Sequence, residues 1–193
     1  MSSTTRRDFL KITGCLTIGF SLGGFSSASP AHVLQELPES LKRHPNINAW
    51  LEVLSDGRIR IFTGKLELGQ GIRTAMAQVA AEELDVDIKN IEVILADTRR
   101  TPDEGYTAGS GSMEQSAMAI RYASAAAREK LLLLASQQLN VPLQELTITN
   151  GIIQTKIGNS AISFSALLDG KQITDQVREP VALKAKKDYR LVG

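Results

Sequence analysis

The pattern of apolar and polar residues changes several times between residues 49 and 170, and each change marks an expected element. The first is a pair of short apolar and β-branched runs, 49–54 and 58–63, on either side of Asp56-Gly57. Asp-Gly between two such runs is a strong hairpin signal, because the tight turn needs positive φ angles that these residues tolerate. The pattern therefore predicts two antiparallel strands.

The next segment has the period of a helix. Gly64 to Gly71 contains three glycines, and apolar residues then recur at the spacing of one helix face, at Ile72, Ala75, Met76, Val79, Ala80 and Leu84. We expect a helix over 71–84 that begins directly from the glycine-rich turn. The apolar run 91–96 that follows predicts a buried strand.

Residues 97–112 have no periodicity and are rich in Gly, Thr, Ser and Pro, which predicts a loop. A second helix is expected from Met113 to about Leu139, and its many alanines let neighbouring elements pack closely. The runs 146–149 and 152–156 flank Asn150-Gly151 and predict a second hairpin.

A short helix is expected over 164–168, because Ser163 is placed to cap it and Gly170 to end it. Strands and helices that alternate in this way predict an α+β domain, with a mixed or antiparallel sheet and two main helices. The domain is expected to span 49–193. The polar, proline-punctuated stretch 29–48 is interpreted as a linker that leads into it, and the tail after residue 170 shows no periodic element.

The first 28 residues are typical of a twin-arginine export signal. Arg6-Arg7 precede a weakly apolar stretch, 12–25, that is diluted by Gly, Ser and Thr, and residues 26–28 resemble a signal peptidase site. The apolar stretch is shorter than the roughly 20 residues that a membrane-spanning helix needs, so no stable span is expected. We expect export to the periplasm, and a retained membrane anchor is the alternative.

Composition narrows the possible ligands. The 193 residues include 22 Lys plus Arg against 21 Asp plus Glu, so the formal charge is +1 and nothing favours binding to nucleic acid. The single cysteine, Cys15, cannot supply the thiolates of an iron–sulfur cluster, and His32 and His44 are too few for a histidine metal site. Any iron–sulfur cluster is expected on another chain.

Gly69, Gln70 and Gly71 lie where the second expected strand turns into the first helix. Glycines let the backbone approach a ligand closely, and free N–H groups at a helix N-terminus favour an anion. The Gln70 side chain can both donate and accept hydrogen bonds. The turn matches neither a Walker loop nor the dinucleotide fingerprint, and an ordinary strand-to-helix reversal without a ligand is the alternative.

The second glycine-rich segment also leads into a helix, with small hydroxyl residues and N–H groups that favour an oxyanion. A purely structural alternative makes Ser112 an N-cap with Gln115 in a capping box. Just upstream, Asp103 and Glu104 are expected to form a turn. Glu82-Glu83 are expected to lie at a solvated helix end, without a catalytic role.

The segment from Glu67 to Thr74, followed by the loop from Thr101 to Ser112, resembles the molybdenum-binding subunits of the xanthine dehydrogenase family. The resemblance is closest to the exported branch typified by the beta subunit of isoquinoline 1-oxidoreductase, with related aldehyde and nicotinate dehydrogenase subunits. It covers Arg6 to Gly193. Since whole subunits of the family are several times longer, we expect this chain to be truncated relative to them.

The resemblance implies a molybdopterin cytosine dinucleotide held by glycine–glutamine turns and serine-bearing loops. Matched motif by motif, the implied cofactor contacts are Gly69, Gln70, Gly71, Thr107, Ala108, Gly109, Ser110, Gly111 and Ser112. In the family, the loop that matches the last six lies beside the metal, and no residue of this chain is assigned as a metal ligand. Glu67, Arg73 and Thr74 belong to the same motif and are expected to buttress it.

The chemistry of the family is oxidative hydroxylation, here of an aldehyde or an N-heterocycle, with electrons passed to an iron–sulfur subunit. The implied partners are that small subunit and the remaining part of the molybdenum subunit. No position matches the late catalytic glutamate of the family, so no catalytic residue is assigned and the chain alone is expected to be inactive. Two other interpretations stay open: a freestanding exported interaction domain without a cofactor, or a non-functional remnant.

Overall fold

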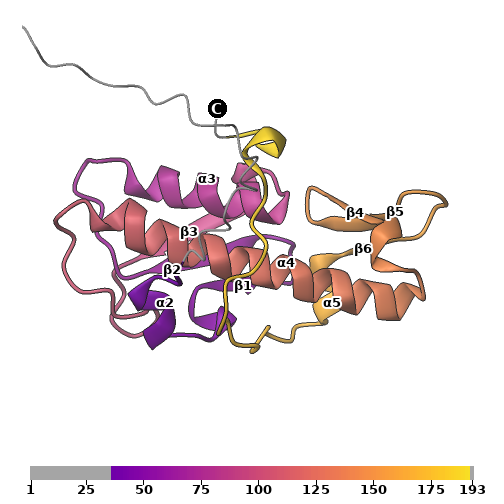
Figure 1. Cartoon of the computed structure of the whole chain (residues 1–193), viewed down its shortest axis with the longest axis horizontal. Helices are drawn as coiled ribbons and strands as arrows, with labels where there is room; N and C mark the ends of the chain where they lie inside the picture. The colour runs from indigo at the N-terminus through magenta and orange to yellow at the C-terminus, as the bar shows by residue number, and fades with distance from the viewer. Residues whose placement is uncertain (1–35, 192–193) are drawn as a thin grey trace, which may run out of the picture. The chain divides into compact units, whose positions relative to one another are not determined.

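The computed structural model describes residues 36–191 (Figure 1). The expected signal at 1–28 and the first part of the expected linker lie outside the described residues. The described part contains two three-stranded sheets, one mixed and one antiparallel, together with two long helices. This confirms the α+β class expected from the alternation of strand and helix patterns.

The first sheet has the strand order β1-β2-β3. The predicted hairpin is formed by β1 (Leu51–Val53) and β2 (Ile59–Thr63), which pair antiparallel. The predicted buried strand is β3 (Ile91–Leu95), and it pairs parallel with β2, so that Ile61 lies opposite Val93. The end of β2 and the end of β3 therefore meet at the same edge of the sheet.

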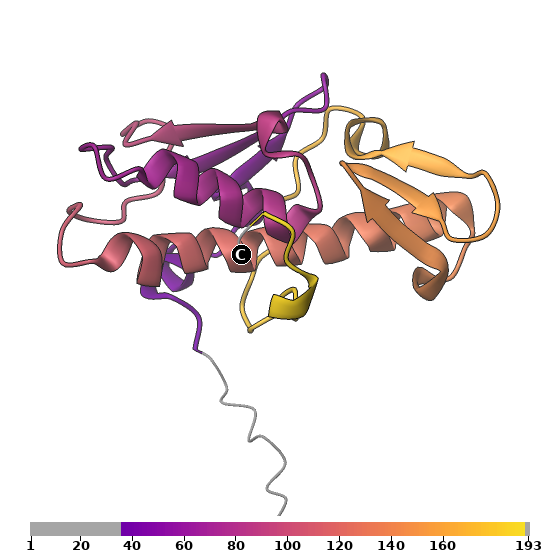
Figure 2. The same ribbon diagram turned by 90° about the horizontal axis from the view of Figure 1, so that it is seen from above.

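The two long helices are α3 (Ile72–Leu84) and α4 (Met118–Leu139), and both lie on the same side of the first sheet (Figures 1 and 2). The helix α3 connects β2 to β3, as the glycine-rich turn and the helical period predicted. Alanines are fully buried on both helices, which allows the close packing expected from the composition of α4. A π-helical turn, Ser112–Ala117, precedes α4.

The second sheet has the order β4-β5-β6 and lies beside the C-terminal half of α4 (Figure 2). The predicted hairpin is β4 (Leu146–Thr149) with β5 (Ile152–Thr155), and a further strand that the sequence pattern did not indicate, β6 (Ala161–Ser163), completes the sheet. The predicted short helix is α5 (Phe164–Leu168), capped by the Ser163 hydroxyl, which accepts a hydrogen bond from the Ala166 N–H.

Part of the expected linker is folded. A short helix, α2 (Glu39–Arg43), carries Leu41, which is completely buried, and the nearby Ile47 is 1% exposed. The Trp50 indole N–H donates to the carbonyl of His44. The core therefore begins before residue 49, because apolar residues spaced among prolines pack on α4 even though the stretch as a whole is polar.

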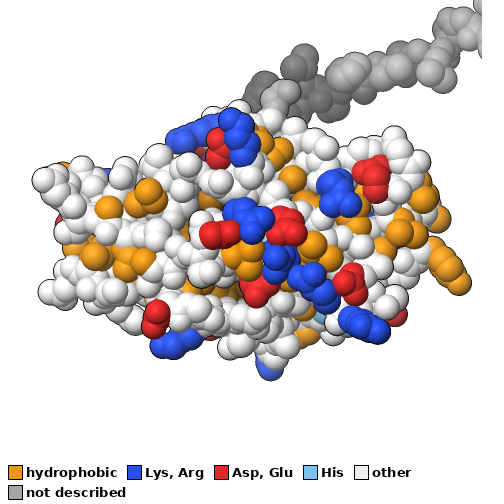
Figure 3. Space-filling model, turned by 180° about the vertical axis from the view of Figure 1, so that it is seen from behind, with side chains coloured by type: hydrophobic (Ala, Val, Ile, Leu, Met, Phe, Trp, Pro, Cys, Tyr) orange, Lys and Arg blue, Asp and Glu red, His pale blue; other side chains and the backbone are white. Residues whose placement is uncertain are grey.

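Short 3₁₀ turns complete the described part, at Ile47–Ala49, Ile88–Asn90, Leu143–Glu145 and Lys186–Asp188. Acidic and basic side chains are interspersed on the face shown in Figure 3, and neither sign dominates it. Between residues 36 and 191, no helix is both long enough and apolar enough to cross a membrane.

Candidate functional site

The two glycine-rich segments meet at one hollow, with a volume of about 610 Å³. Gln70 lines it from the first segment, and five of the six predicted residues line it from the second. The complete lining is Leu68, Gln70, Ile72, Ala75, Thr107, Ala108, Gly109, Ser110, Ser112, Met113 and Glu114. The predicted residues Gly69, Gly71 and Gly111 flank the hollow in sequence but do not line it.

The segments are held together at the end of β2. The hydroxyl of Thr63 and the N–H of Gly64 both donate to Oε2 of Glu104, at 2.5 and 2.7 Å. A Cβ atom on Gly64 would lie 2.5 Å from the carbonyl oxygen of Pro102, so only glycine allows this approach. Glu104 is buried, and it joins two segments in addition to forming the turn that the sequence predicted.

The next two residues continue this contact. The ammonium group of Lys65 donates to the carbonyls of Glu104 and Tyr106, at 2.8 Å each. The N–H of Leu66 donates to the hydroxyl of Thr107, also at 2.8 Å. Four consecutive residues of one segment are thus bonded to the other, which places the predicted cofactor residues side by side.

The first turn is closed by its own acidic residue. The carboxylate of Glu67 accepts hydrogen bonds from the N–H groups of Gly69, Gly71 and Arg73, at 2.9, 3.0 and 3.1 Å. The N–H of Arg73, and then those of Gly71 and Gly69, outweigh the opposing effect of burial and hold the pKa of Glu67 below its usual value. These three N–H groups are therefore already bonded within the chain, and Glu67 supports the turn as expected.

The side chain of Gln70 is also bonded within the first turn. Its Oε1 accepts from the N–H of Leu68 at 2.6 Å, and its Nε2 donates to the carbonyl of Leu66 at 2.8 Å. These two bonds fix the side chain at the wall of the hollow. An amide nitrogen has two N–H bonds and an amide oxygen two lone pairs, so Gln70 keeps one further donor and one further acceptor.

The second segment is open instead. Within residues 36–191, the N–H groups of Ala108, Gly109 and Ser110 donate no hydrogen bond. Gly109 and Ser110 have φ values of 61° and 58°, in the left-handed region, and nothing lies within 4 Å of a Cβ built on Gly109. Unpaired N–H groups in a segment that lines a hollow are suited to bind an oxyanion.

The structural alternative for this segment is wrong. The π-helical turn begins at Ser112, so Gly111 rather than Ser112 occupies the N-cap position, and no side-chain capping hydrogen bond is formed there within residues 36–191. The Oε1 of Gln115 accepts from the N–H of Glu39, at 3.4 Å, instead of returning to the start of its own helix. Upstream, Asp103 forms the turn expected of it, because its carboxylate accepts from the N–H of Gly105 at 3.0 Å.

Glu82 and Glu83 do not lie at a solvated helix end, so that expectation is wrong. Glu83 is 1% exposed, and its carboxylate is bound by Arg121 at 2.8 Å and by Arg128 at 3.1 Å. Both arginines come from α4, and local periodicity gives no sign of a partner so distant in sequence. Glu83, Arg121 and Arg128 form an ion cluster, and none of the three lines the hollow.

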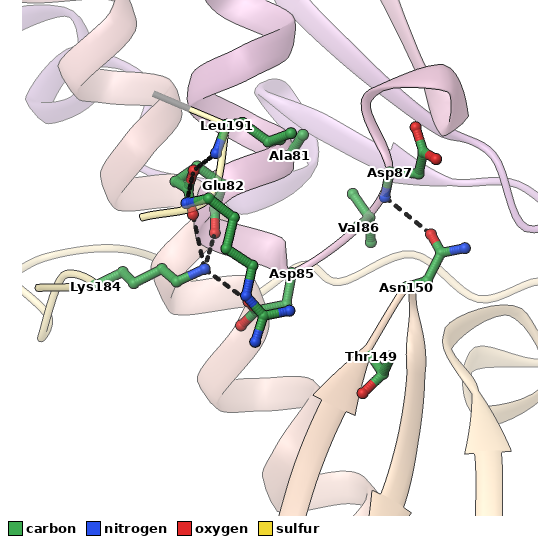
Figure 4. A pocket seen from close by; sticks show the side chains of 10 residues that line it. Ala81, Glu82, Asp85, Val86, Asp87, Thr149, Asn150, Lys184 and Leu191 are labelled. Atoms are coloured by element: carbon green, nitrogen blue, oxygen red, sulfur yellow. Dashed lines mark hydrogen bonds and ion pairs between the residues drawn. The ribbon is translucent and has the colours of Figure 1, made fainter. Parts of the chain in front are cut away.

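Glu82 is bound by the C-terminal tail (Figure 4). The ammonium group of Lys184 lies between Glu82 and Asp85, at 2.8 and 2.7 Å, and the N–H groups of Arg190 and Leu191 donate to the second oxygen of Glu82. Burial raises the pKa of Glu82, but the bond from Lys184 and those from Leu191 and Arg190 outweigh it and leave the pKa lowered. The tail is therefore part of the fold.

The hollow beside this cluster, of about 320 Å³, contains none of the predicted site residues. Between residues 36 and 191, no group of three or more His, Cys, Asp or Glu side chains is arranged to hold a metal ion. The hollow between the two glycine-rich segments is thus the candidate site.

A family profile described as a molybdopterin cofactor-binding domain matches residues 11–191. The chain belongs to the molybdopterin cofactor-binding domain family. A nicotinate dehydrogenase subunit of Pseudomonas putida is 40% identical over 144 residues, which make up 75% of this chain and 12% of that protein. The beta subunit of isoquinoline 1-oxidoreductase from Brevundimonas diminuta is 27% identical over 181 residues, 89% of this chain and 22% of that protein.

These relatives confirm the expected membership in the xanthine dehydrogenase family, as part of a molybdopterin-binding subunit. The molybdopterin-binding domain described here spans only 12% and 22% of the length of the two relatives. Among solved structures, reconstituted CO dehydrogenase from Oligotropha carboxidovorans superposes with a TM-score of 0.54 at 23% identity, over 61% of this chain and 15% of that one. This likeness concerns the fold.

The residues that line the hollow fit the family's cofactor. Leu68, Ile72 and Met113 are apolar and suit the flat face of a pterin, while the hydroxyls and unpaired N–H groups of the second segment suit a phosphate. Among residues 36–191, no lysine or arginine lines the hollow and Glu114 is the one charged residue that does, so a bound anion would be held by neutral donors away from that carboxylate. Helix N-termini and turns with open N–H groups bind anions in this way.

Proposed function

We propose that this chain is the cofactor-holding segment of a molybdenum hydroxylase subunit that oxidises an aldehyde or an N-heterocycle. The observation that carries the proposal is the hollow at which Gln70 and the loop from Thr107 to Ser112 meet. The N–H groups of Ala108 to Ser110 have no partner within residues 36–191 and border this hollow. Family membership gives the class of ligand, and the hollow gives a place for it.

In this proposal, each segment has its own task. The N–H groups of Ala108, Gly109 and Ser110 and the hydroxyl of Ser112 bind a phosphate group, and Gln70 forms the facing wall. When bound, the cofactor supplies a molybdenum centre that accepts two electrons from the substrate. The chain's own residues bind and orient the cofactor, and we assign none of them a proton transfer.

We extend the proposal to the finer features that the sequence implies: the cytosine dinucleotide form of the cofactor, a small iron–sulfur partner subunit and the remaining part of the molybdenum subunit. Two of the relatives are themselves subunits, which supports an assembly of several chains. Apolar side chains are exposed beside the hollow, with Leu68 70% and Tyr106 93% accessible, which supports a covering polypeptide. The chain alone is then inactive.

Metal and nucleotide analysis tests the cofactor. The chain, purified from its own host with whatever copurifies, is expected to carry one molybdenum and to release cytosine monophosphate on hydrolysis. The double substitution Ser110→Ala with Ser112→Ala is expected to lower the molybdenum content roughly fivefold or more, through lost hydrogen bonds to an anion. Ser160→Ala, in an exposed turn beyond β5, is the matched control. A folded wild-type chain without molybdenum contradicts the proposal.

Export is tested separately. We propose that Arg6-Arg7 direct the folded chain to the periplasm. Replacement of both by lysine is expected to leave the chain in the cytoplasm, whereas Lys11→Arg keeps the pair and serves as the control. Fractionation and immunoblotting give the result, and periplasmic chain in the double variant contradicts the proposal.

A second candidate function is an interaction domain without a cofactor. The exposed apolar side chains around the hollow favour it, because Leu66 and Met113 are also about half exposed. This candidate predicts a folded, metal-free wild-type chain that still associates with a partner. The metal analysis above therefore separates the two candidates.

A further inference from the structure

The contact between the end of β2 and the second glycine-rich segment has an unusual composition. Its side chains are polar or charged, yet Thr63 is fully buried, Lys65 is 5% exposed and Glu104 is 8% exposed. Nothing in the sequence pattern gave Lys65 a role. We call Thr63, Lys65 and Glu104 the turn clamp.

Lys65 is buried without an acidic partner. Among the described residues, no carboxylate lies within ion-pair distance of its ammonium group, which donates to the carbonyls of Glu104 and Tyr106. Burying an ammonium group in this way costs free energy that a neutral side chain avoids. Its bonds go to the backbone just before Thr107, where the lining of the hollow begins.

The side chain of Glu104 makes the reciprocal contact, from the second segment to the end of β2. Its Oε2 accepts from Thr63 and Gly64, while its Oε1 is buried and has no hydrogen-bond partner within the described residues. Within that part of the chain, the hydrogen bonds of its carboxylate therefore all come from the end of β2. The Lys65 side chain therefore bonds to the backbone of the second segment, and the Glu104 side chain bonds to Thr63 and Gly64 at the end of β2.

We propose that Lys65 and Glu104 are positioning residues that hold the segment 105–110 against the end of β2, and so set the place of its open N–H groups before a cofactor binds. The inference rests on the proposed function, because it assigns the clamp a purpose at the same hollow. A loop whose N–H groups lack internal partners has little order of its own, and ordering it in advance removes that cost from binding. Neither residue is a cofactor contact.

Hydrogen exchange of the full chain tests the positioning directly, with or without a cofactor. Lys65→Met keeps the length of the side chain and removes its donors, and Glu104→Leu removes the acceptor for Thr63. Both are expected to accelerate exchange of the hydrogen-bonded N–H groups of Leu66 and Gly111 about tenfold or more, while 146–155, in the second sheet, stays unchanged. Lys89→Met, at an exposed lysine, is the control.

The conservative variant Glu104→Gln provides the rescue. Its amide oxygen can accept from Thr63 and Gly64, so exchange of the Leu66 and Gly111 N–H groups is expected within about twofold of wild type. This separates a hydrogen-bond role from a general sensitivity of the buried position. If all Glu104 variants exchange alike, or if 146–155 accelerates equally with Leu66 and Gly111, the proposal is overturned.

The molybdenum content of the same preparations links the clamp to the ligand. Lys65→Met, which accelerates exchange, is also expected to lower the molybdenum content. Lys89→Met is expected to keep the wild-type molybdenum content. If exchange is unchanged in Lys65→Met and Glu104→Leu, the positioning role of the turn clamp is overturned, whatever the metal content is. A metal-free wild type contradicts the proposed function instead, and exchange still decides whether the clamp holds the loop.

Discussion

The two glycine-rich segments resemble each other in sequence and differ in their hydrogen bonding. Each leads into a helix, and each contains glycines in the left-handed region. In the first, Glu67 and Gln70 accept hydrogen bonds from four N–H groups, those of Leu68, Gly69, Gly71 and Arg73, whereas the N–H groups of Ala108 to Ser110 have no partner within residues 36–191. A glycine-rich turn at a helix N-terminus is therefore open to an anion only where the chain does not supply one itself.

The position of acidic residues explains the difference. Glu67 lies two residues before Gly69 and four before Gly71, where its carboxylate reaches both N–H groups. Residues 105–113 contain no acidic residue, and Glu104 is bonded to the end of β2. This difference predicts which changes close the second segment, open the first or separate the two.

The largest effect is expected from Gly64→Ala, which separates the two segments. The added methyl group would lie 2.5 Å from the carbonyl oxygen of Pro102, so the junction must move, at a cost of about 2–3 kcal/mol in the free energy of unfolding. Gly111→Ala is the control, because nothing lies within 4 Å of its Cβ and its φ is −66°. Denaturant unfolding measures both, and equal stabilities would contradict the steric argument.

Ala108→Asp is expected to close the second segment as Glu67 closes the first. Ala108 is exposed and two residues before Ser110, so a carboxylate there can accept the open N–H groups and repel an anionic ligand. Molybdenum content is expected to fall about tenfold, while the free energy of unfolding changes by no more than about 0.5 kcal/mol. The neutral Ala108→Asn is the matched control, and full metal content in Ala108→Asp would contradict the assignment.

Glu67→Ala is expected to open the first turn by removing its carboxylate. The N–H groups of Gly69, Gly71 and Arg73 lose their shared acceptor, so their hydrogen exchange is expected to accelerate about tenfold. Molybdenum content is expected to change less than in Ala108→Asp, since Gly69, Gly71 and Arg73 do not line the hollow. Glu129→Ala, at an exposed position of α4 that does not line the hollow, is the control, and a larger loss of metal in Glu67→Ala would show that the turn itself binds the cofactor.

The smallest effect is a difference in pH dependence. The N–H bonds from Arg73, Gly71 and Gly69 lower the pKa of Glu67 from the ordinary 4.5, so their stabilisation is complete above pH 4.5 and is lost as the pH falls through the lowered value. In an NMR titration, the amide signals of Gly69 and Gly71 are expected to shift with a midpoint below 4.5. The signals of Gly109 and Gly111 should not follow that titration.

Local sequence signals predicted the elements whose geometry is set by near neighbours. Asp56-Gly57 and Asn150-Gly151 marked both hairpins, and the helical spacing after Gly71 marked α3. The closure of the first turn was also readable, because Glu67 precedes the glycines whose N–H groups it binds at a fixed short spacing. The closure was not predicted, because the N–H groups at this helix N-terminus were expected to bind a ligand anion.

Features that join distant segments were not predicted. Lys184 reaches Glu82 across 102 residues, and Lys65 reaches the carbonyl of Tyr106 across 41. Such contacts depend on tertiary packing, which a periodic pattern does not encode. For the same reason, Leu41 was assigned to a linker, although α4 provides it with an apolar environment.

The two ion pairs of Glu83 determine the orientation of α4 about its own axis. Arg121 and Arg128 are two helical turns apart, about 10 Å along one face, and both bind the same buried carboxylate. Rotation of α4, or sliding along its length, would break both ion pairs at once. The π-helical turn that leads into this helix begins at Ser112, which lines the hollow, so an ion cluster outside the hollow also restrains the position of Ser112 in its wall.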